Sequence, residues 1–302
     1  MSKNAWFDRL STRVALGAIT ALLALASPWL ARADDMRIVA AGGLVTEVLY
    51  ALGAENRLVG VDATSLEPAS ALRDKPNVGY MRQLSPEGIL SLKPTRVIAI
   101  PGAGPPGALD LIRAAGASVE TIPEAAGEFA AAANIRAVGA AAGLDVAAEA
   151  LASQVEARLR RLAAARERVA AAPRRVMFVL ALREGRPMVA GRATGADAII
   201  RLAGGVNAFH AVEGYKAVSE EAVIAAAPDV ILAMDRAGAR IDPAALFATP
   251  AFAATPAART RRFVSMDAQY LLAFGPRTPQ AARDLMAALY PEQPIPSLDA
   301  DR

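Results

Sequence analysis

The chain has 302 residues, of which 54% are hydrophobic and 21% charged, enough for one large domain or two ordinary ones with buried cores. It contains no cysteine and one histidine, which excludes disulfides, zinc fingers, a thiol nucleophile and a metal site built on several histidines. Its 33 basic and 30 acidic residues give no nucleic-acid-binding signature.

Residues 1–33 have the three parts of a secretory signal peptide. A basic segment precedes an apolar run from Val14 to Leu25, and Ala31-Arg32-Ala33 forms an A-x-A cleavage site. The run is shorter than the roughly 20 residues of a membrane span, so an uncleaved anchor is the less favoured alternative. Without cysteine, a lipoprotein-type anchor is also excluded. We therefore expect cleavage after Ala33 and a soluble exported protein, which in a two-membrane bacterium is periplasmic.

The first part of the mature chain alternates short strands with short helices. Strands are predicted over residues 37–40, 58–61, 97–100 and 119–122, and helices over residues 45–52, 86–92 and 108–114. The strands are continuous apolar, β-branched runs, which are typical of a parallel sheet covered on both faces. We therefore expect an α/β N-terminal lobe, residues 34–142, built on a mainly parallel, Rossmann-like sheet.

A long helix follows, and the chain then returns to the α/β pattern. Residues 146–169 contain no glycine or proline and carry a narrow apolar stripe, which predicts one helix about 36 Å long. Further strands are expected over residues 176–182, 187–190 and 230–233, and a helix over residues 196–203. We expect a spine helix within residues 143–172 and a second α/β lobe over residues 173–302. Because a helix resists bending, this segment should connect the two regions more stiffly than a loop would.

The two lobes share a short repeat. The segment Ser85-Pro86-Glu87 and the strand at 97–100 match Ser219-Glu220-Glu221 and the strand at 230–233, at an offset of 134 residues. Chance similarity between two helix–strand units is the alternative explanation. The repeat aligns Glu87 with Glu221, each in the first turn of a predicted helix, where the helix dipole favours a carboxylate.

Two sequence motifs of enzymes are either incompatible with their usual chemistry or absent. Residues 102–107 spell G-x-G-x-x-G after a strand, but Pro105 and Pro106 lack the backbone N–H groups that hold a pyrophosphate. We interpret this segment as a rigid loop at the mouth of a cleft. There is no G-x-S-x-G sequence, and His210 is the one imidazole available as a base. A secreted α/β enzyme is therefore a less favoured function.

Tyr80 and Arg82 lie two positions apart, so both side chains would point to the same face if their segment were an extended strand. A neighbouring guanidinium favours the phenolate form of a tyrosine. A phenolate oxygen is a hard donor suited to ferric iron, and tyrosine is an axial haem ligand in some proteins. On the pattern alone, a surface tyrosine stacked on an arginine is the simpler interpretation.

Several segments resemble the haem-binding periplasmic proteins of bacterial haem ABC importers. They span nearly the whole mature chain and are GGLVTEVLYALGAENRLVGVDATS, VGYMRQLSPEGILSLKP, GAGPP, GYKAVSEEAVIAAAPDVIL and QYLLAFGPRTPQA. That family belongs to the helix-linked class of substrate-binding proteins, which also contains cobalamin and siderophore binders. The resemblance implies two α/β lobes, a single spine helix, and ferric haem b held between the lobes as the transported ligand.

The resemblance also implies roles for individual residues. Tyr80 matches the tyrosine that ligates the iron, and Arg82 matches the arginine that hydrogen-bonds its oxygen. Arg236 is the nearest counterpart of a second arginine from the C-terminal lobe, and His210 is a candidate second iron ligand.

Tyr215 and Lys216 are candidate contacts for a haem propionate, with local packing of Tyr215 as the alternative. Glu87 and Glu221 match glutamates that face arginines of a permease dimer, with helix capping as the alternative. The expected function is a monomeric periplasmic haem carrier, not an enzyme, that receives haem downstream of an outer-membrane receptor and delivers it to an inner-membrane ABC permease. A siderophore or cobalamin binder of the same fold is the alternative.

Overall fold

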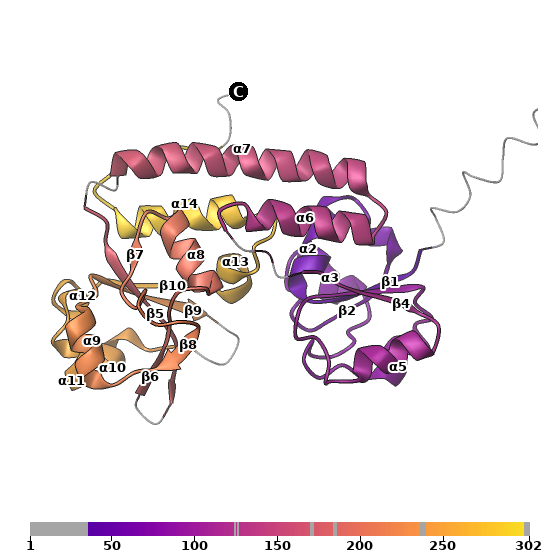
Figure 1. Cartoon of the computed structure of the whole chain (residues 1–302), viewed down its shortest axis with the longest axis horizontal. Coiled ribbons are helices and arrows are strands. Elements are labelled where there is room, and N and C mark those ends of the chain that lie inside the picture. Colours follow the sequence, from indigo (N-terminus) through magenta and orange to yellow (C-terminus); the bar gives the residue numbers. More distant parts are fainter. Residues whose placement is uncertain are drawn as a thin grey trace, which may run out of the picture.

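The computed structural model describes residues 36–123, 125, 127–169, 172–183, 186–235 and 240–298. The predicted signal peptide and Arg236 lie outside these residues. In the described part of the chain, two sheets lie beneath opposite ends of the long helix α7 (Asp145–Val169), as Figure 1 shows. No helix among the described residues is long and apolar enough to cross a membrane.

The N-terminal lobe is built on a four-stranded parallel sheet with the order β2-β1-β3-β4. Its strands are β1 (Ile38–Ala41), β2 (Leu58–Val61), β3 (Arg96–Ala99) and β4 (Ser118–Thr121). Its helices are α2 (Gly43–Ala51), η1 (Glu55–Arg57), α3 (Ser70–Asp74), α4 (Pro86–Ser91), α5 (Ala108–Ala114) and α6 (Ala130–Ala141). Every side chain of the central strand β1 is fully buried, as expected of an apolar strand covered on both faces.

The C-terminal lobe is built on a mixed six-stranded sheet with the order β10-β9-β5-β6-β8, and β7 also pairs with β5. Its strands are β5 (Arg175–Arg183), β6 (Arg186–Ala190), β7 (Val206–Asn207), β8 (Tyr215–Ala217), β9 (Val230–Asp235) and β10 (Phe263–Asp267). Strands β7, β9 and β10 run parallel to β5, whereas β6 is antiparallel to both β5 and β8. Its helices are α8 (Gly195–Leu202), α9 (Glu220–Ala226), α10 (Pro243–Ala248), α11 (Pro250–Ala253), α12 (Pro256–Thr260), α13 (Ala268–Leu272) and α14 (Thr278–Leu289).

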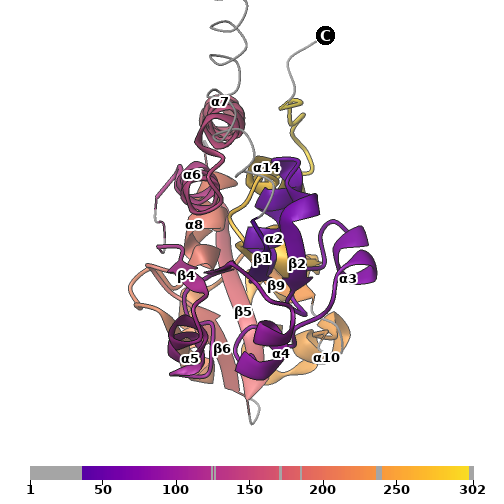
Figure 2. The ribbon, with the colours of Figure 1, turned by 90° about the vertical axis from the view of Figure 1, so that its right-hand side faces the viewer.

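The spine helix α7 packs on both lobes through one narrow face. Val155, Leu159 and Leu162 are buried on it as part of the predicted apolar stripe, and alanines such as Ala148 and Ala152 extend the same stripe. Figure 2, which looks along α7, shows the helix lying above α6 and α14, one from each lobe. A single cluster of buried apolar side chains runs through the cores of both lobes and beneath this helix. The expected single connecting helix is therefore part of a shared core.

The predicted repeat is confirmed at the level of one helix–strand unit. The Ser85 hydroxyl accepts a hydrogen bond from the Gly88 N–H at the start of α4, and the Ser219 hydroxyl accepts one from the Ala222 N–H at the start of α9. The strand that follows each helix pairs in parallel with the first strand of its lobe, β3 with β1 and β9 with β5. The two lobes therefore place Glu87 and Glu221 at matching points.

Candidate functional site

The carboxyl ends of the parallel strands in the two lobes are turned toward each other. In the N-terminal lobe β1 runs into α2, and in the C-terminal lobe β10 runs into α13. These two helices meet, because a Cβ atom added at Gly43 would lie 2.8 Å from the Gln269 side-chain amide carbon. Ligands of open α/β folds bind outside the carboxyl ends of the strands. We call the strand ends and loops that face each other here the inter-lobe face, and it is the candidate site.

Tyr80 lies in a turn that backbone hydrogen bonds hold against two strand ends of the inter-lobe face. The Gly79 carbonyl accepts a hydrogen bond from the Ala63 N–H (2.8 Å), just beyond β2, and the Met81 carbonyl accepts one from the Gly104 N–H (2.9 Å), beyond β3. Met81 is 5% exposed, whereas Tyr80 is 45% exposed. The turn is therefore anchored by its backbone and by Met81, which leaves the Tyr80 side chain accessible.

The segment that carries Tyr80 and Arg82 is not extended, so the condition under which both side chains would share one face is not met. The Gln83 N–H donates to the Tyr80 carbonyl (2.7 Å) and closes a turn. The reason is that Met81 and Leu84, three residues apart, are both buried, which a turn satisfies and a strand does not. Among the described residues no hydrogen bond joins Tyr80 to Arg82, so their joint action on a ligand stays a prediction.

The glycine-rich loop after β3 supports this turn. Gly102, Gly104 and Gly107 have φ angles of 78°, 147° and 84°, which side chains other than glycine rarely adopt. A Cβ atom at Gly102 would lie 3.1 Å from Nη1 of Arg82, so the guanidinium rests against this loop. Gly102 therefore permits a close approach between the loop and the Tyr80 turn.

Asp62, which follows β2 directly, is a buried carboxylate that joins its own loop to the turn between β1 and α2. Its Oδ1 accepts hydrogen bonds from the Gly42 N–H (2.9 Å) and the Ser65 hydroxyl (3.1 Å). Its Oδ2 accepts hydrogen bonds from the N–H (2.9 Å) and the hydroxyl (2.7 Å) of Thr64. Charge-assisted hydrogen bonds of this kind compensate the burial of a carboxylate. Sequence reasoning missed Asp62, although an Asp followed by Thr and Ser after a strand is a signal for such a turn.

We expect the substitution Asp62→Ala to lower the free energy of unfolding by about 3 kcal/mol, because it leaves several buried donors without an acceptor. Denaturant unfolding of the ligand-free protein measures this loss. Asp110→Ala is the matched control, since Asp110 is exposed and its ion pair with Arg113 contributes little. Equal unfolding free energies for the two variants would contradict the role assigned to Asp62.

Two of the predicted C-terminal site residues lie on the edge strand β8. Tyr215 pairs with Ala190 and Lys216 with Val189 of β6, and both predicted residues are exposed. Arg236 follows β9 directly but lies outside the described residues. At the end of β9, the Ser265 hydroxyl donates to the Asp235 carboxylate, and Arg240 also contacts it. These contacts, Ser265 first, hold the pKa of Asp235 below its ordinary value.

His210 is not brought to the inter-lobe face. It follows β7, which pairs with the first residues of β5, whereas the inter-lobe face lies at the carboxyl ends of β9 and β10. Its ring Nδ1 lies 3.3 Å from the Asn207 carbonyl oxygen within the same turn. The geometry therefore favours the interpretation of His210 as an ordinary loop residue. The described residues contain no group of three His, Cys, Asp or Glu residues that could hold a metal ion.

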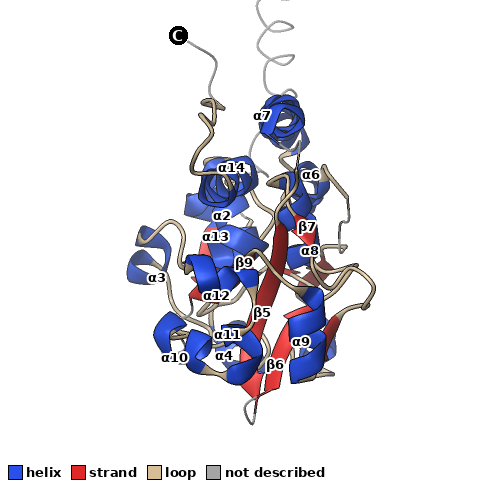
Figure 3. Cartoon of the chain, turned by 90° about the vertical axis from the view of Figure 1, so that its left-hand side faces the viewer, coloured by secondary structure: helices blue, strands red, loops and turns tan. Residues whose placement is uncertain are grey.

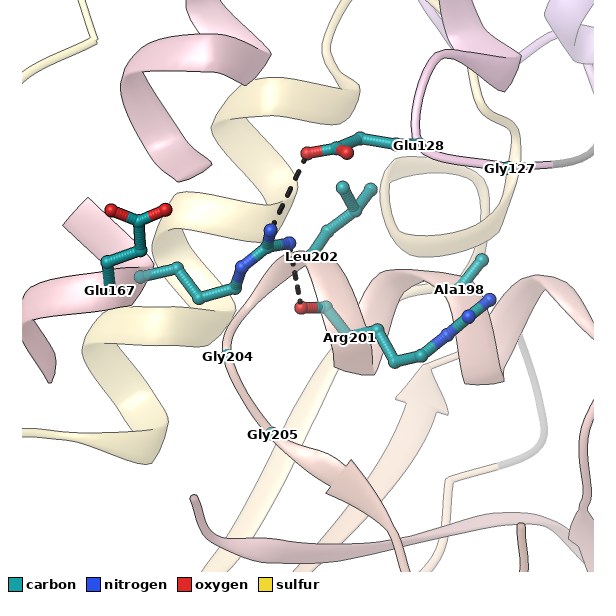
Figure 4. A pocket seen from close by; sticks show the side chains of 9 residues that line it. Gly127, Glu128, Glu167, Ala198, Arg201, Leu202, Gly204 and Gly205 are labelled. Atoms are coloured by element: carbon teal, nitrogen blue, oxygen red, sulfur yellow. Dashed lines mark hydrogen bonds and ion pairs between the residues drawn. The ribbon is translucent and has the colours of Figure 1, made fainter. Parts of the chain in front are cut away.

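A cavity of about 600 Å³ lies away from the inter-lobe face, between the last turn of α7 and the helix α8 (Figure 4). Glu128 and Arg201 line it from opposite sides, and Arg166 lies between them, 3.8 Å from the Glu128 carboxylate and 3.5 Å from the Arg201 carbonyl. None of its lining residues comes from a carboxyl strand end or from the Tyr80 turn. Two of its charged groups, Glu128 and Arg166, already pair with each other, and the cavity lies apart from the predicted site residues, so it is not the candidate site.

The arrangement of two α/β lobes on one helix agrees with comparisons to known proteins. The model of the family described as "Periplasmic binding protein" matches residues 38–270. The chain belongs to this family. A member of the periplasmic binding protein family is a binding protein that works outside the cytoplasm, which agrees with a site formed between lobes rather than around a nucleophile.

Three relatives of this periplasmic binding protein are informative. The periplasmic heme-binding protein RhuT from Roseiflexus sp. RS-1, in apo form, is 40% identical with a TM-score of 0.77, over 85% of this chain and 98% of that one. The periplasmic heme-binding protein BhuT, in complex with two hemes, is 43% identical with a TM-score of 0.76, over 84% and 97%. An uncharacterized ABC transporter substrate-binding lipoprotein of Bacillus subtilis (strain 168), YvrC, is 22% identical over 82% of this chain and 77% of that one.

Proposed function

We propose that the chain is a periplasmic haem carrier, the substrate-binding component of an ABC importer that delivers ferric haem to an inner-membrane permease. The observation that carries the proposal is the accessible Tyr80, anchored by the backbone of its turn at the carboxyl ends of β2 and β3. The identity of 40% and 43% to two haem-binding proteins, over most of the chain, supports haem as the ligand.

The proposed haem site draws on both lobes. Tyr80 ligates the iron through its phenolate oxygen, and Arg82 donates a hydrogen bond to that oxygen. Arg236, Tyr215 and Lys216 contribute from the C-terminal lobe, where cationic and hydroxyl groups suit the haem propionates. His210 is left out of the proposed site because it lies at the other end of the sheet.

The proposed organisation keeps the predicted boundaries: a signal peptide over residues 1–33, lobes over residues 34–142 and 173–302, and a linking spine over residues 143–172. The two separate sheets, one on each side of α7 in the sequence, support this division. Export through the signal peptide places the carrier in the periplasm, where an outer-membrane receptor supplies haem.

A titration of the purified mature protein with haemin tests the proposal. We expect a visible absorption band that saturates, with the high-spin ferric features of a tyrosinate ligand, and a 1:1 end point. Cobalamin and a ferric siderophore, offered to the same protein, should not bind. Saturable binding of either one, without a haem spectrum, would instead identify a siderophore or cobalamin carrier of the same fold.

We further propose that Glu87 and Glu221 dock the carrier on a permease dimer. Both carboxylates are exposed in the first turn of a short helix, and Figure 3 shows both helices, α4 and α9, at the end of the molecule remote from α7. The Ser85 hydroxyl lies 3.1 Å from the Glu87 carboxylate, and the hydrogen bond from Ser219 lowers the pKa of Glu221. Both carboxylates therefore lie on the same side of the molecule, which suits two like subunits with basic contact residues.

A further inference from the structure

The lobes are joined at a second place besides α7, through an ion pair that crosses between them. Glu47 lies on α2 of the N-terminal lobe, and Arg277 directly precedes α14 of the C-terminal lobe. Nε of Arg277 lies 2.9 Å from Oε1 of Glu47, and Nη2 lies 3.1 Å from Oε2. This two-bond arrangement fixes orientation as well as distance, because the guanidinium is planar. We call the pair the clasp.

The Arg277 side of the clasp is held in place by its own lobe. Its guanidinium lies 5.2 Å from the ring centre of Tyr270, a cation–π distance. The Tyr270 hydroxyl in turn donates to the Asp284 carboxylate (2.8 Å) on α14. Burial, and then this hydrogen bond, raise the pKa of Tyr270, so its phenol stays protonated and continues to donate. The Arg277 guanidinium therefore faces Glu47 in a fixed orientation, with two N–H groups toward the carboxylate.

The lobes also pack closely around the clasp. A Cβ atom added at Gly275 would lie 3.2 Å from Cδ1 of Leu44 and 3.5 Å from the Glu47 carboxylate carbon. Beside it, the Asn134 side-chain amide on α6 donates to the Phe274 carbonyl across the lobes (3.0 Å). Figure 1 shows α2 and α13 facing each other in the middle of the molecule, below α6 and α14. The clasp is thus part of a tight seam and not an isolated surface pair.

Opening or twisting of the lobes has to break this pair. The Glu47 side chain is 9% exposed and the Arg277 side chain 34% exposed, so separation leaves a largely buried carboxylate without its cation. Loss of one partner from a buried ion pair is strongly unfavourable. The clasp therefore adds to the spine helix and its shared core in opposing motion between the lobes. Glu47 lies on α2, which follows β1, and β1 pairs with both β2 and β3, the strands whose ends anchor the Tyr80 turn.

We propose that Glu47 and Arg277 are positioning residues that set the spacing between the two walls of the ligand site. This inference rests on the proposed function, since it assigns the clasp the task of keeping the haem-binding walls at their bound separation in the empty carrier. Neither residue needs to touch haem. The clasp then keeps the empty carrier in the arrangement of lobes that binds haem, so binding does not include the free-energy cost of reaching that arrangement.

Distance measurement on the ligand-free protein tests the proposal without haem. Because the chain has no cysteine, Leu111→Cys on α5 and Ile224→Cys on α9 place one spin label on an exposed position of each lobe. We expect a narrow distance distribution, which Glu47→Gln shifts or broadens. If the binding-competent fraction falls to about a tenth, haem affinity falls about tenfold in the same variant.

Glu149→Gln is the matched control, since Glu149 also makes a two-bond pair, with Arg136 on α6, but that pair does not join the lobes. It should leave the distance distribution and haem affinity unchanged.

If Glu47→Gln does not fold, Arg277→Lys tests the proposal instead, because it keeps the positive charge and loses the planar guanidinium that forms two hydrogen bonds. An unaltered distance distribution in the folded variant, even with a lower melting temperature, would overturn the proposal. If the wild type binds no haem, the proposed function fails, while the distances still decide whether the clasp sets the spacing.

Discussion

The substitution Tyr80→Phe should abolish the tyrosinate features of the haem spectrum and weaken haem binding by at least about 100-fold, since even partners that only support a metal ligand contribute 10–100-fold. The change removes one hydroxyl. The turn itself is held by backbone hydrogen bonds at Gly79 and Met81, so it should keep its shape. Visible-absorption titration with haemin, together with a thermal melt of the empty protein, measures both effects.

Tyr50→Phe is the matched control, because Tyr50 lies near the carboxyl end of α2, away from the inter-lobe face. Tyr290 is unsuitable as a control, since it is 2% exposed and its hydroxyl donates to the Gly204 carbonyl (2.6 Å) in the core. If Tyr80→Phe binds haemin with wild-type affinity and spectrum, Tyr80 is not the iron ligand.

Most of the fold follows from local sequence patterns. The strand at residues 58–61 and the helix at residues 108–114 occur with the predicted bounds. The strand is an apolar run that ends before Asp62, and the helix lies between Gly107 and Gly116. The helix α6 was not predicted, since its alanine-rich sequence shows little contrast between its faces. The helices α10 to α13 have only four to six residues each, too few to show an apolar period. Three of them, α10, α12 and α13, begin at the capping side chains of Asp242, Thr255 and Asp267.

The candidate site could be predicted only in part, because its geometry depends on contacts between distant residues. Tyr80 was found through its resemblance to a known motif, but the burial of Met81 and Leu84 that bends its segment was not. Glu47 has the sequence context of an ordinary helical residue, and its partner Arg277 lies 230 positions away. No spacing rule connects such a pair, so the clasp becomes visible only in the folded chain.

The double substitution Glu87→Ala/Glu221→Ala should leave the haem spectrum and affinity intact and reduce haem transfer into a reconstituted transporter about tenfold. Each exposed ion pair contributes up to about 1 kcal/mol, so a single substitution should have a smaller effect than the double one. Uptake of haem into vesicles that contain the permease, at low ionic strength, measures the difference. Added salt should shrink it, because exposed charges are screened.

Capping and docking make different predictions for the serines beside these glutamates. Ser85 and Ser219 each accept a hydrogen bond from a helix N–H, so the double substitution Ser85→Ala/Ser219→Ala removes both caps and keeps both charges. It should lower thermal stability while transfer continues at low salt. The glutamate variant should show the opposite pattern, with near-normal stability and poor transfer. If transfer instead falls in the serine variant and is unimpaired in the glutamate variant, the carboxylates serve the helix starts and the carrier docks through other residues.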